Sequence, residues 1–207
     1  LLAPLRMLSR REEKVSFNGT VFFFGIGAGF MFGELLFVYL GTFFMGEPVV
    51  SLTFTLAATL VSSGLGGLWA GRRNRSFLRA SLAVAPLVLS LTAGGLMAFS
   101  PQVLALPAPV RGIVLLLAVA LPGFLMGMPF PTGMRDLAQS PSARSYAWAA
   151  NGCAAVLASI LSAQIAISAG FAWLLAAAAA AYGAAFLSLW RTPLTIDIKK
   201  QTVMHGR

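Results

Sequence analysis

Long apolar runs separated by short polar segments dominate the pattern of this chain. Six runs have about the twenty residues that an α-helix needs to cross a hydrocarbon core of about 30 Å. Backbone groups in a bilayer must bond within their own segment, so each run is predicted to be a helix. The alternation of apolar and polar residues that marks a membrane barrel is missing from these runs. The predicted spans cover residues 17–44, 49–70, 77–99, 110–128, 146–168 and 171–190.

The composition agrees with this pattern. Hydrophobic residues make up 58% of the chain and charged residues only 10%, whereas a soluble domain has about 25% charged residues. We therefore predict an all-α integral membrane protein, a bundle of six transmembrane helices within residues 17–190. Residues 1–16 are expected to be a cytoplasmic segment, which also fits the end of an earlier span, and residues 191–207 form a basic tail.

The net charge of +9 is explained by topology rather than by nucleic-acid binding. The basic residues lie in short segments between the apolar runs. When six spans alternate, every Lys and Arg except Arg111 falls on one side of the membrane. Since positive loops stay in the cytoplasm, both termini are predicted to be cytoplasmic, in a bacterial inner membrane. The expected partner is the lipid bilayer, and no nucleic acid is expected.

The segment from Pro122 to Asn151 joins two of these runs. It closes the fourth run and is predicted to turn at Pro129 to Gly133. A charged loop over residues 132–145, which includes Arg135, is then expected before the fifth span opens.

Small residues four positions apart indicate close helix packing. In the first span they are Gly25, Gly29 and Gly33. In the second span they follow Thr59 and are Ser63, Gly67 and Gly71. Such small-xxx-small faces let the backbones of two helices approach each other in a membrane.

Three polar side chains inside the spans are candidates for ligand or ion binding. A charge near the bilayer centre costs a few kcal/mol, so Glu34 is expected to face the bundle interior, a partner or water. It fits a hydrogen-bonded structural carboxyl, a group that handles protons or cations, or an anchor for a neighbouring subunit or headgroup. Asn151 and Gln164 lie apart around the fifth helix, and each is expected to bond to a neighbouring helix.

Residues for metal or nucleophilic chemistry are sparse in the sequence. The single cysteine, Cys153, cannot form an intramolecular disulfide or a cysteine-cluster metal site. The single histidine, His205, lies in the tail. We predict no catalytic residues, no metal and no cofactor.

Two stretches carry a resemblance to a known family. Gly123-Phe-Leu-Met-Gly-Met-Pro-Phe-Pro-Thr-Gly-Met-Arg135 and Tyr146-Ala-Trp-Ala-Ala-Asn-Gly152 resemble segments of the membrane-embedded spermidine-synthase-like (polyamine aminopropyltransferase-like) proteins. The Gly29–Glu34 and Ser63–Gly71 stretches fit the same pattern. The resemblance runs from about Val15 to Trp190, and Pro129, Pro131, Gly133 and Arg135 form its most specific motif. Glu34, Arg135 and Asn151 match by position, and no functional role is carried over to them.

The resemblance implies a soluble α/β domain that binds decarboxylated S-adenosylmethionine or a relative. These 207 residues contain no pattern of a strand, a Gly-rich turn and a helix, so this chain alone is not expected to transfer aminopropyl groups. We expect it to be the C-terminal membrane region of a longer protein, or a subunit of a larger membrane complex. The predicted function is a non-catalytic membrane-anchoring bundle. The alternative is a transporter of a small cation, such as a polyamine, that uses Glu34.

Overall fold

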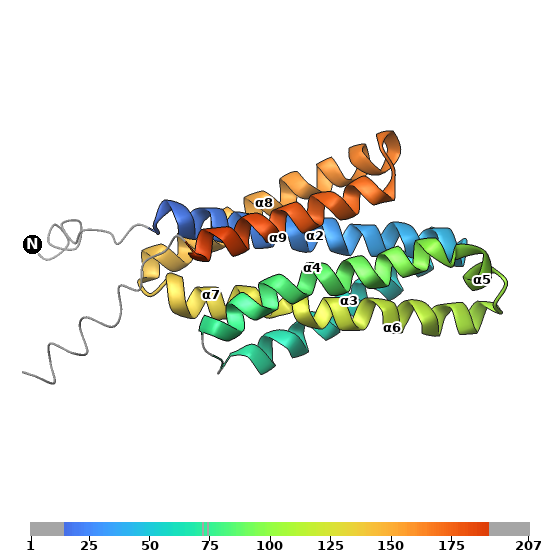
Figure 1. Ribbon diagram of the computed structural model, residues 1–207, viewed down its shortest axis with the longest axis horizontal. Coiled ribbons are helices and arrows are strands. Elements are labelled where there is room, and N and C mark those ends of the chain that lie inside the picture. The colour runs from blue at the N-terminus through green and yellow to red at the C-terminus, as the bar shows by residue number, and fades with distance from the viewer. Residues whose placement is uncertain (1–14, 72, 74, 191–207) are drawn as a thin grey trace, which may run out of the picture.

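The computed structural model describes residues 15–71, 73 and 75–190 (Figure 1). The expectations for residues 1–14, for the tail at 191–207 and for His205 lie outside these ranges. Every regular element within them is a helix. The helices are α2 (Phe17–Met45), α3 (Pro48–Ala70), α4 (Arg75–Ala98), α5 (Ser100–Leu104), α6 (Ala108–Gly127), α7 (Pro129–Leu137), α8 (Pro141–Ser168) and α9 (Phe171–Trp190).

Six helical stretches are long enough and apolar enough to cross a membrane: α2, α3, α4, α6 together with α7, α8 and α9. This finding confirms the predicted all-helical fold and the predicted number of spans, and it indicates an integral membrane protein. The ends of the spans differ from the predicted ones by a few residues at most, except around α7.

Helix α2 lies at the centre of the bundle. It packs against α8 and α9 on one side and against α3 on the other, while α4 lies between α9 and α6 (Figure 1). Most of α2 is buried, as expected for a helix that is apolar around its whole circumference. Helix α8, by contrast, leaves most of its surface exposed.

Local sequence signals set the ends of these helices. The Ser16 side chain accepts a hydrogen bond from the Gly19 amide at 3.1 Å and caps the start of α2. Gly46, with φ of 75°, ends α2, and Gly170, with φ of 90°, joins α8 to α9. Glycine adopts this left-handed conformation without steric cost, so both connections are short.

The predicted charged loop over residues 132–145 is wrong. Helix α7 occupies Pro129–Leu137, α8 begins at Pro141, and only residues 138–140 between them are not helical. Proline fits the first turn of a helix, where its missing amide is not needed, so Pro129 and Pro141 each start a helix.

Gly133 explains why α7 lies inside the bundle rather than on the surface. A Cβ atom at this position would collide with the ring of Phe22 on α2, so α7 is in close contact with the central helix.

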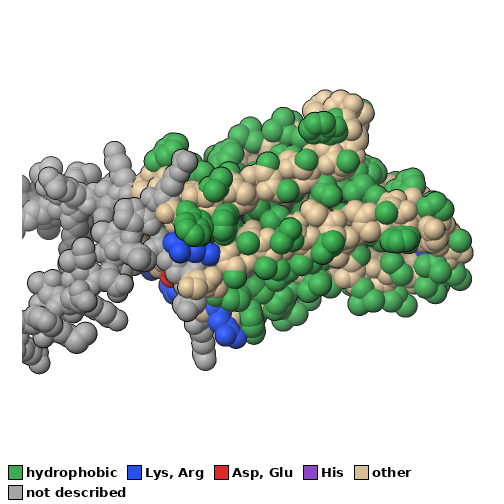
Figure 2. Space-filling model, in the orientation of Figure 1, with side chains coloured by type: hydrophobic (Ala, Val, Ile, Leu, Met, Phe, Trp, Pro, Cys, Tyr) green, Lys and Arg blue, Asp and Glu red, His purple; other side chains and the backbone are tan. Residues whose placement is uncertain are grey.

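All but one of the basic side chains that the structure describes gather at one end of the bundle. Figure 2 shows them at the end where α2 and α8 begin, whereas apolar side chains cover the rest of the visible face. Arg73, Arg79, Arg135 and Arg144 belong to this basic end, and Arg111 lies near the opposite end.

Candidate functional site

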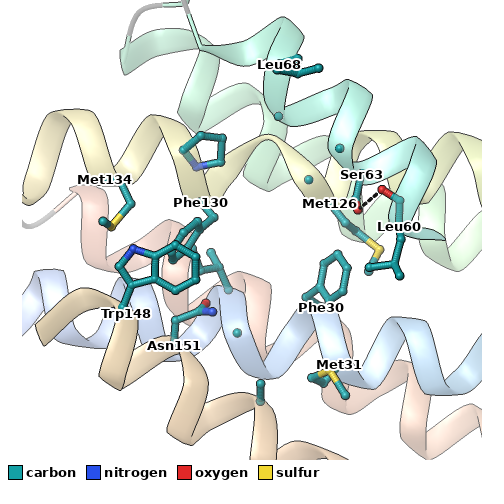
Figure 3. Close-up of a pocket in the computed structure, with 17 residues that line it drawn as sticks. Phe30, Met31, Leu60, Ser63, Leu68, Met126, Phe130, Met134, Trp148 and Asn151 are labelled. Carbon is teal, nitrogen blue, oxygen red and sulfur yellow. Dashed lines mark hydrogen bonds between the residues drawn. The ribbon is translucent and has the colours of Figure 1, made fainter. Parts of the chain in front are cut away.

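A large lateral cavity lies next to the central helix. It has a volume of about 920 Å³ and is enclosed by α2, α3, the α6–α7 junction and α8. Apolar residues form most of its wall, and the largest of them include Phe30, Met126, Phe130 and Met134 (Figure 3). Cavities of this size and apolar character are typical of small-molecule sites.

The mouth of this cavity opens between α3 and α8. Leu60 and Leu68 on α3 and Trp148 on α8 line it and are 62%, 81% and 61% exposed. Because these exposed side chains belong to membrane-spanning helices, the cavity opens sideways toward lipid.

Asn151 is the main polar group in the cavity wall. Its side chain projects from α8 beside Trp148 and Phe130 (Figure 3). It makes no hydrogen bond to any other residue that the structure describes, so the expected bond to a neighbouring helix is not formed. A Cβ atom at Gly27 would collide with the Asn151 carbonyl oxygen, and α8 therefore lies directly against α2 here.

Trp148 lines the part of the cavity that lies toward the basic end. Its ring packs edge-on against Phe130 with 4.7 Å between ring centroids. The neighbouring Tyr146 hydroxyl accepts a 3.4 Å hydrogen bond from the Thr20 side chain. These two aromatic residues therefore join the start of α8 to α7 and α2.

Glu34 lies deeper in the bundle than the cavity. Its side chain is 5% exposed, and its Oε1 atom is buried without a hydrogen-bond partner in the part of the chain that the structure describes. Gly27, Glu34 and Gly41 are seven residues apart, nearly two helical turns, so they share one face of α2. Gly27 lines the cavity and Gly41 meets Ser51 on α3. Glu34 therefore lies between the cavity and the point where α2 and α3 touch.

Gln164 lies apart from Asn151 and Glu34. It is near the far end of α8, its side chain is exposed, and that side chain has no hydrogen bond within the described ranges. The structure thus does not bring the three predicted polar residues together into one site.

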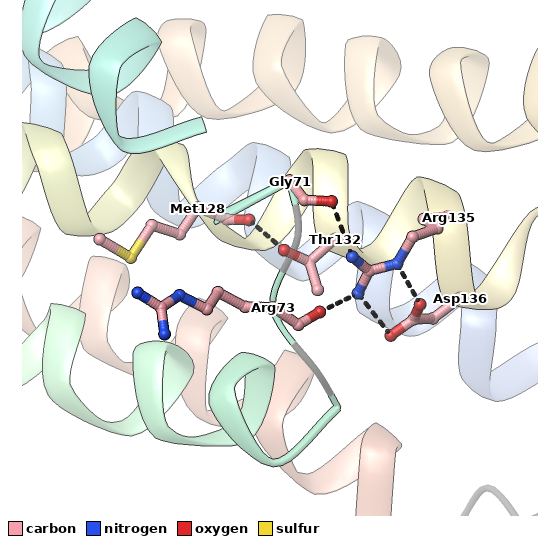
Figure 4. Close-up of polar contacts among 6 residues, drawn as sticks. All are labelled: Gly71, Arg73, Met128, Thr132, Arg135 and Asp136. Carbon is pink, nitrogen blue, oxygen red and sulfur yellow. Dashed lines mark hydrogen bonds and ion pairs between the residues drawn. The ribbon is translucent and has the colours of Figure 1, made fainter. Parts of the chain in front are cut away.

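A polar clasp lies at the basic end of the bundle, close to the cavity (Figure 4). The Arg135 guanidinium on α7 donates hydrogen bonds to the carbonyl oxygens of Gly71, at 2.8 Å, and Arg73. It also pairs with the adjacent Asp136 carboxylate at 2.8 Å. The clasp ties the segment after α3 to α7, which gives Arg135 of the predicted motif a specific structural place.

The small residues of α2 lie in two tight contacts. A Cβ atom at Gly25 would be 2.7 Å from the Ala181 carbonyl oxygen, and one at Gly29 would be 2.8 Å from the Tyr182 ring, both on α9. Gly33 turns instead toward Met126 of α6, where its Cβ would be 2.9 Å from the Cε atom.

On α3 the small residues pack along two neighbouring rows. Thr59 is buried as predicted, but the next buried small residues are Ser62, Gly66 and Ala70, which pack toward α6. Residues spaced by four move gradually around a helix that has 3.6 residues per turn. The step of three from Thr59 to Ser62 therefore keeps the first row on one face. The predicted Ser63 and Gly67 form the second row, which lines the cavity and also meets Gly127 of α6. Gly71 follows the helix as an exposed residue.

A second, smaller cavity lies near the opposite end of the bundle. It has a volume of about 420 Å³ between α2, α8 and the start of α9, and Tyr39 and Ala163 are part of its wall. Within the described part of the chain, none of the side chains that line this second cavity is charged.

Sequence reasoning missed the large cavity, because its wall comes from four segments that are far apart in the chain. Gly27 and Gly127 line the cavity, but each is a point where two helices touch, so no local sequence signal marks the space beside them. Among the described residues, no group of three or more His, Cys, Asp or Glu side chains is placed to hold a metal ion.

Comparison of this chain with protein-family models, with curated protein sequences and with solved structures finds no match.

Proposed function

We propose that this chain is a membrane-anchoring bundle whose basic end holds a partner domain or subunit at the membrane surface. The Arg135 clasp carries this proposal. It fixes the end of α3 and the end of α7 relative to each other, and so supports a rigid polar surface where a soluble partner can rest. Arg135 also ends the motif that resembles the spermidine-synthase-like proteins, which combine membrane spans with a soluble enzyme domain.

The proposal includes an orientation and a location. The basic end, with Arg73, Arg79, Arg135 and Arg144, faces the cytoplasm of a bacterial cell, and both termini lie on that side of the inner membrane. The partner is either a soluble domain of the same protein, as the family resemblance suggests, or another subunit of a membrane complex.

The first test is the intact mass of the protein extracted from its native membrane in mild detergent without affinity tags. A mass well above 21.8 kDa, with peptides upstream of Leu1, supports the membrane region of a larger protein. A mass near 21.8 kDa with other subunits in the same particle supports a separate subunit. A stable monomer of that mass that is free of other proteins contradicts the proposal.

A variant pair connects this test to the clasp. Arg135→Lys keeps the positive charge but cannot donate to two carbonyl oxygens in the same fork geometry. It should release the partner, whereas Asp136→Asn, which keeps both carbonyl bonds, should retain it. Equal retention of the partner by both variants argues against the clasp as the support of the docking surface.

The buried Glu34 favours a second candidate function, transport of a small cation such as a polyamine. Among the described residues, one oxygen of the Glu34 carboxyl has no hydrogen-bond partner, and Glu34 lies beside a membrane cavity. This arrangement supports cation transport. The chain would be reconstituted into liposomes and the uptake of labelled spermidine measured. Uptake that is equal in the native chain and in Glu34→Gln rules out this use of Glu34.

A further inference from the structure

The face of α8 that lines the large cavity extends to the basic end of the bundle. Arg144, Trp148, Asn151 and Ala155 are spaced by four, three and four residues, so they share one face of the helix. The last three line the cavity, and Arg144 lies one turn closer to the basic end. The face therefore begins with the cationic Arg144 and the amphipathic Trp148. It continues with the amide of Asn151 and ends at the small apolar Ala155.

Arg144 is free to bind an anion. Its Nε donates a 3.2 Å hydrogen bond to the Ala138 carbonyl oxygen, which holds the side chain near the start of α8. Its two terminal amino groups make no hydrogen bond within the described part of the chain, and the residue is exposed. The nearby Arg135, by contrast, is committed to the clasp.

The start of α8 adds a second attraction for an anion. Arg144 lies in the first turn of this 28-residue helix, whose N-terminus carries a positive partial charge. Ser140 caps the helix by accepting a hydrogen bond from the Ala143 amide at 3.2 Å. Acidic side chains are absent from the described residues of this first turn, so nothing there offsets the positive charge.

We infer that the cavity binds a phosphate-headed membrane lipid, with its phosphate at Arg144 and the start of α8 and its apolar chain between Phe30, Met126 and Trp148. The lateral mouth admits a chain directly from the bilayer, and the Asn151 amide meets the polar linkage between head and chain. The site does not depend on the proposed anchoring function, because none of its residues belongs to the clasp.

Quenching of tryptophan fluorescence by brominated lipids tests this inference. The chain has four tryptophans. Two reporters would each keep one of them, Trp148 in the cavity wall or Trp173 on the surface of α9, with the other three changed to Phe. Each reporter is placed in phosphatidylcholine vesicles that contain either brominated phosphatidylglycerol or brominated phosphatidylcholine at the same mole fraction.

The expected result is a preference at Trp148 alone. Brominated phosphatidylglycerol should associate there about three- to fivefold more strongly than brominated phosphatidylcholine, the size expected for one basic residue next to an anionic lipid. Trp173 should be quenched equally by both lipids. Equal quenching of Trp148 by both lipids overturns the inference.

Variants separate a lipid in the cavity from a lipid that is merely attracted to the surface. Arg144→Gln should abolish the preference at Trp148, and so should Ala155→Phe, which fills the cavity and leaves the charge in place. Ala163→Phe, which fills the second cavity, is the control and should change nothing. A preference that survives Ala155→Phe means ordinary surface lipid and overturns the inference.

Competition identifies which phosphate-headed lipid the site prefers. Unlabelled phosphatidylglycerol and a polyprenyl phosphate would each be added to the Trp148 reporter. Relief of quenching by either lipid supports the site, and the more effective one shows whether a glycerol-linked or an isoprenoid chain fits better. Relief by neither lipid contradicts it.

Discussion

Single glycine residues set the distances between helices in this bundle. Gly66 on α3 touches the backbone of Phe124 on α6, and Gly127 on α6 touches the backbone of Ser63 on α3, so each helix supplies a glycine to the other. Gly64, only two residues from Gly66 on the same helix, has no neighbour within 4 Å of the position of a Cβ atom. Neighbouring glycines of the same helix are therefore expected to differ sharply in their tolerance of a methyl group.

Gly66→Ala is predicted to destabilise the bundle. The new methyl group would overlap the Phe124 carbonyl oxygen, which is backbone and cannot move away alone. Overpacking of this kind costs about 1–3 kcal/mol in the free energy of unfolding. The measurement is reversible unfolding by SDS in mixed micelles, with Gly64→Ala as the control, which should be neutral or stabilising by up to about 1 kcal/mol. Equal losses in both variants would falsify this account of the α3–α6 contact.

Tyr182→Phe is predicted to leave the bundle as stable as before, or more stable by about 1 kcal/mol. Tyr182 is fully buried against Gly29, and its hydroxyl has no hydrogen-bond partner among the described residues. The substitution keeps the ring and removes an unsatisfied polar group. Tyr182→Ala should instead cost about 3–5 kcal/mol, because it leaves a cavity. A loss of stability in Tyr182→Phe, measured in the same unfolding assay, would show that the hydroxyl does have a partner.

At the scale of the helices, hydrophobic patterning was enough to predict the spans but not how they pair. An apolar run of about twenty residues indicates the length of a span and its lipid surroundings, and α2, α3, α4, α6, α8 and α9 agree with that signal. The pairing of α2 with α8 and α9 depends on where Gly25, Gly27 and Gly29 meet surfaces more than a hundred residues away, which periodicity does not report. For the same reason the cavity was not predicted.

The error at α7 has a different origin. Two prolines and a glycine between Pro129 and Gly133 are turn signals in an isolated segment. Here Pro129 occupies the first turn of a helix, where proline is favoured, and Gly133 allows that helix to contact Phe22. The local sequence allowed either a turn or a helix here. The contact between Gly133 and Phe22 favours the helix.

Arg135→Lys is predicted to loosen the segment after α3. The guanidinium hydrogen bonds to Gly71 and Arg73 hold this segment against α7. The group is exposed, so we expect a loss of about 1 kcal/mol or less in global stability. Amide hydrogen exchange should rise locally in peptides that cover the end of α3. Asp136→Asn should leave that exchange unchanged, because the ion pair joins adjacent residues and spans no gap. Faster exchange in both variants would show that the Arg135–Asp136 pair also holds this segment, and unchanged exchange in Arg135→Lys would contradict the role of the clasp.

At the scale of the whole molecule, the distribution of charge predicts the orientation in the membrane. Cysteine would be introduced at Ala105, in the short connection after α5, or at Gln139, between α7 and α8, with Cys153 changed to Ser. Both positions are exposed, at opposite ends of the bundle. A membrane-impermeant maleimide added to intact cells should label Ala105→Cys and should reach Gln139→Cys only after lysis. The reverse pattern would contradict the proposed cytoplasmic location of the basic end.

The central position of α2 has a consequence for how the bundle is made. Its main neighbours, α8 and α9, follow it by roughly a hundred residues, and at about 5–20 residues per second a ribosome takes about 5–20 s to supply them. During this interval α2 is not yet covered by α8 and α9. The Glu34 carboxyl then lies closer to lipid than it does in the finished bundle. Because a carboxyl in lipid is costly, we expect α2 to stay beside the insertion machinery until the later helices enclose Glu34.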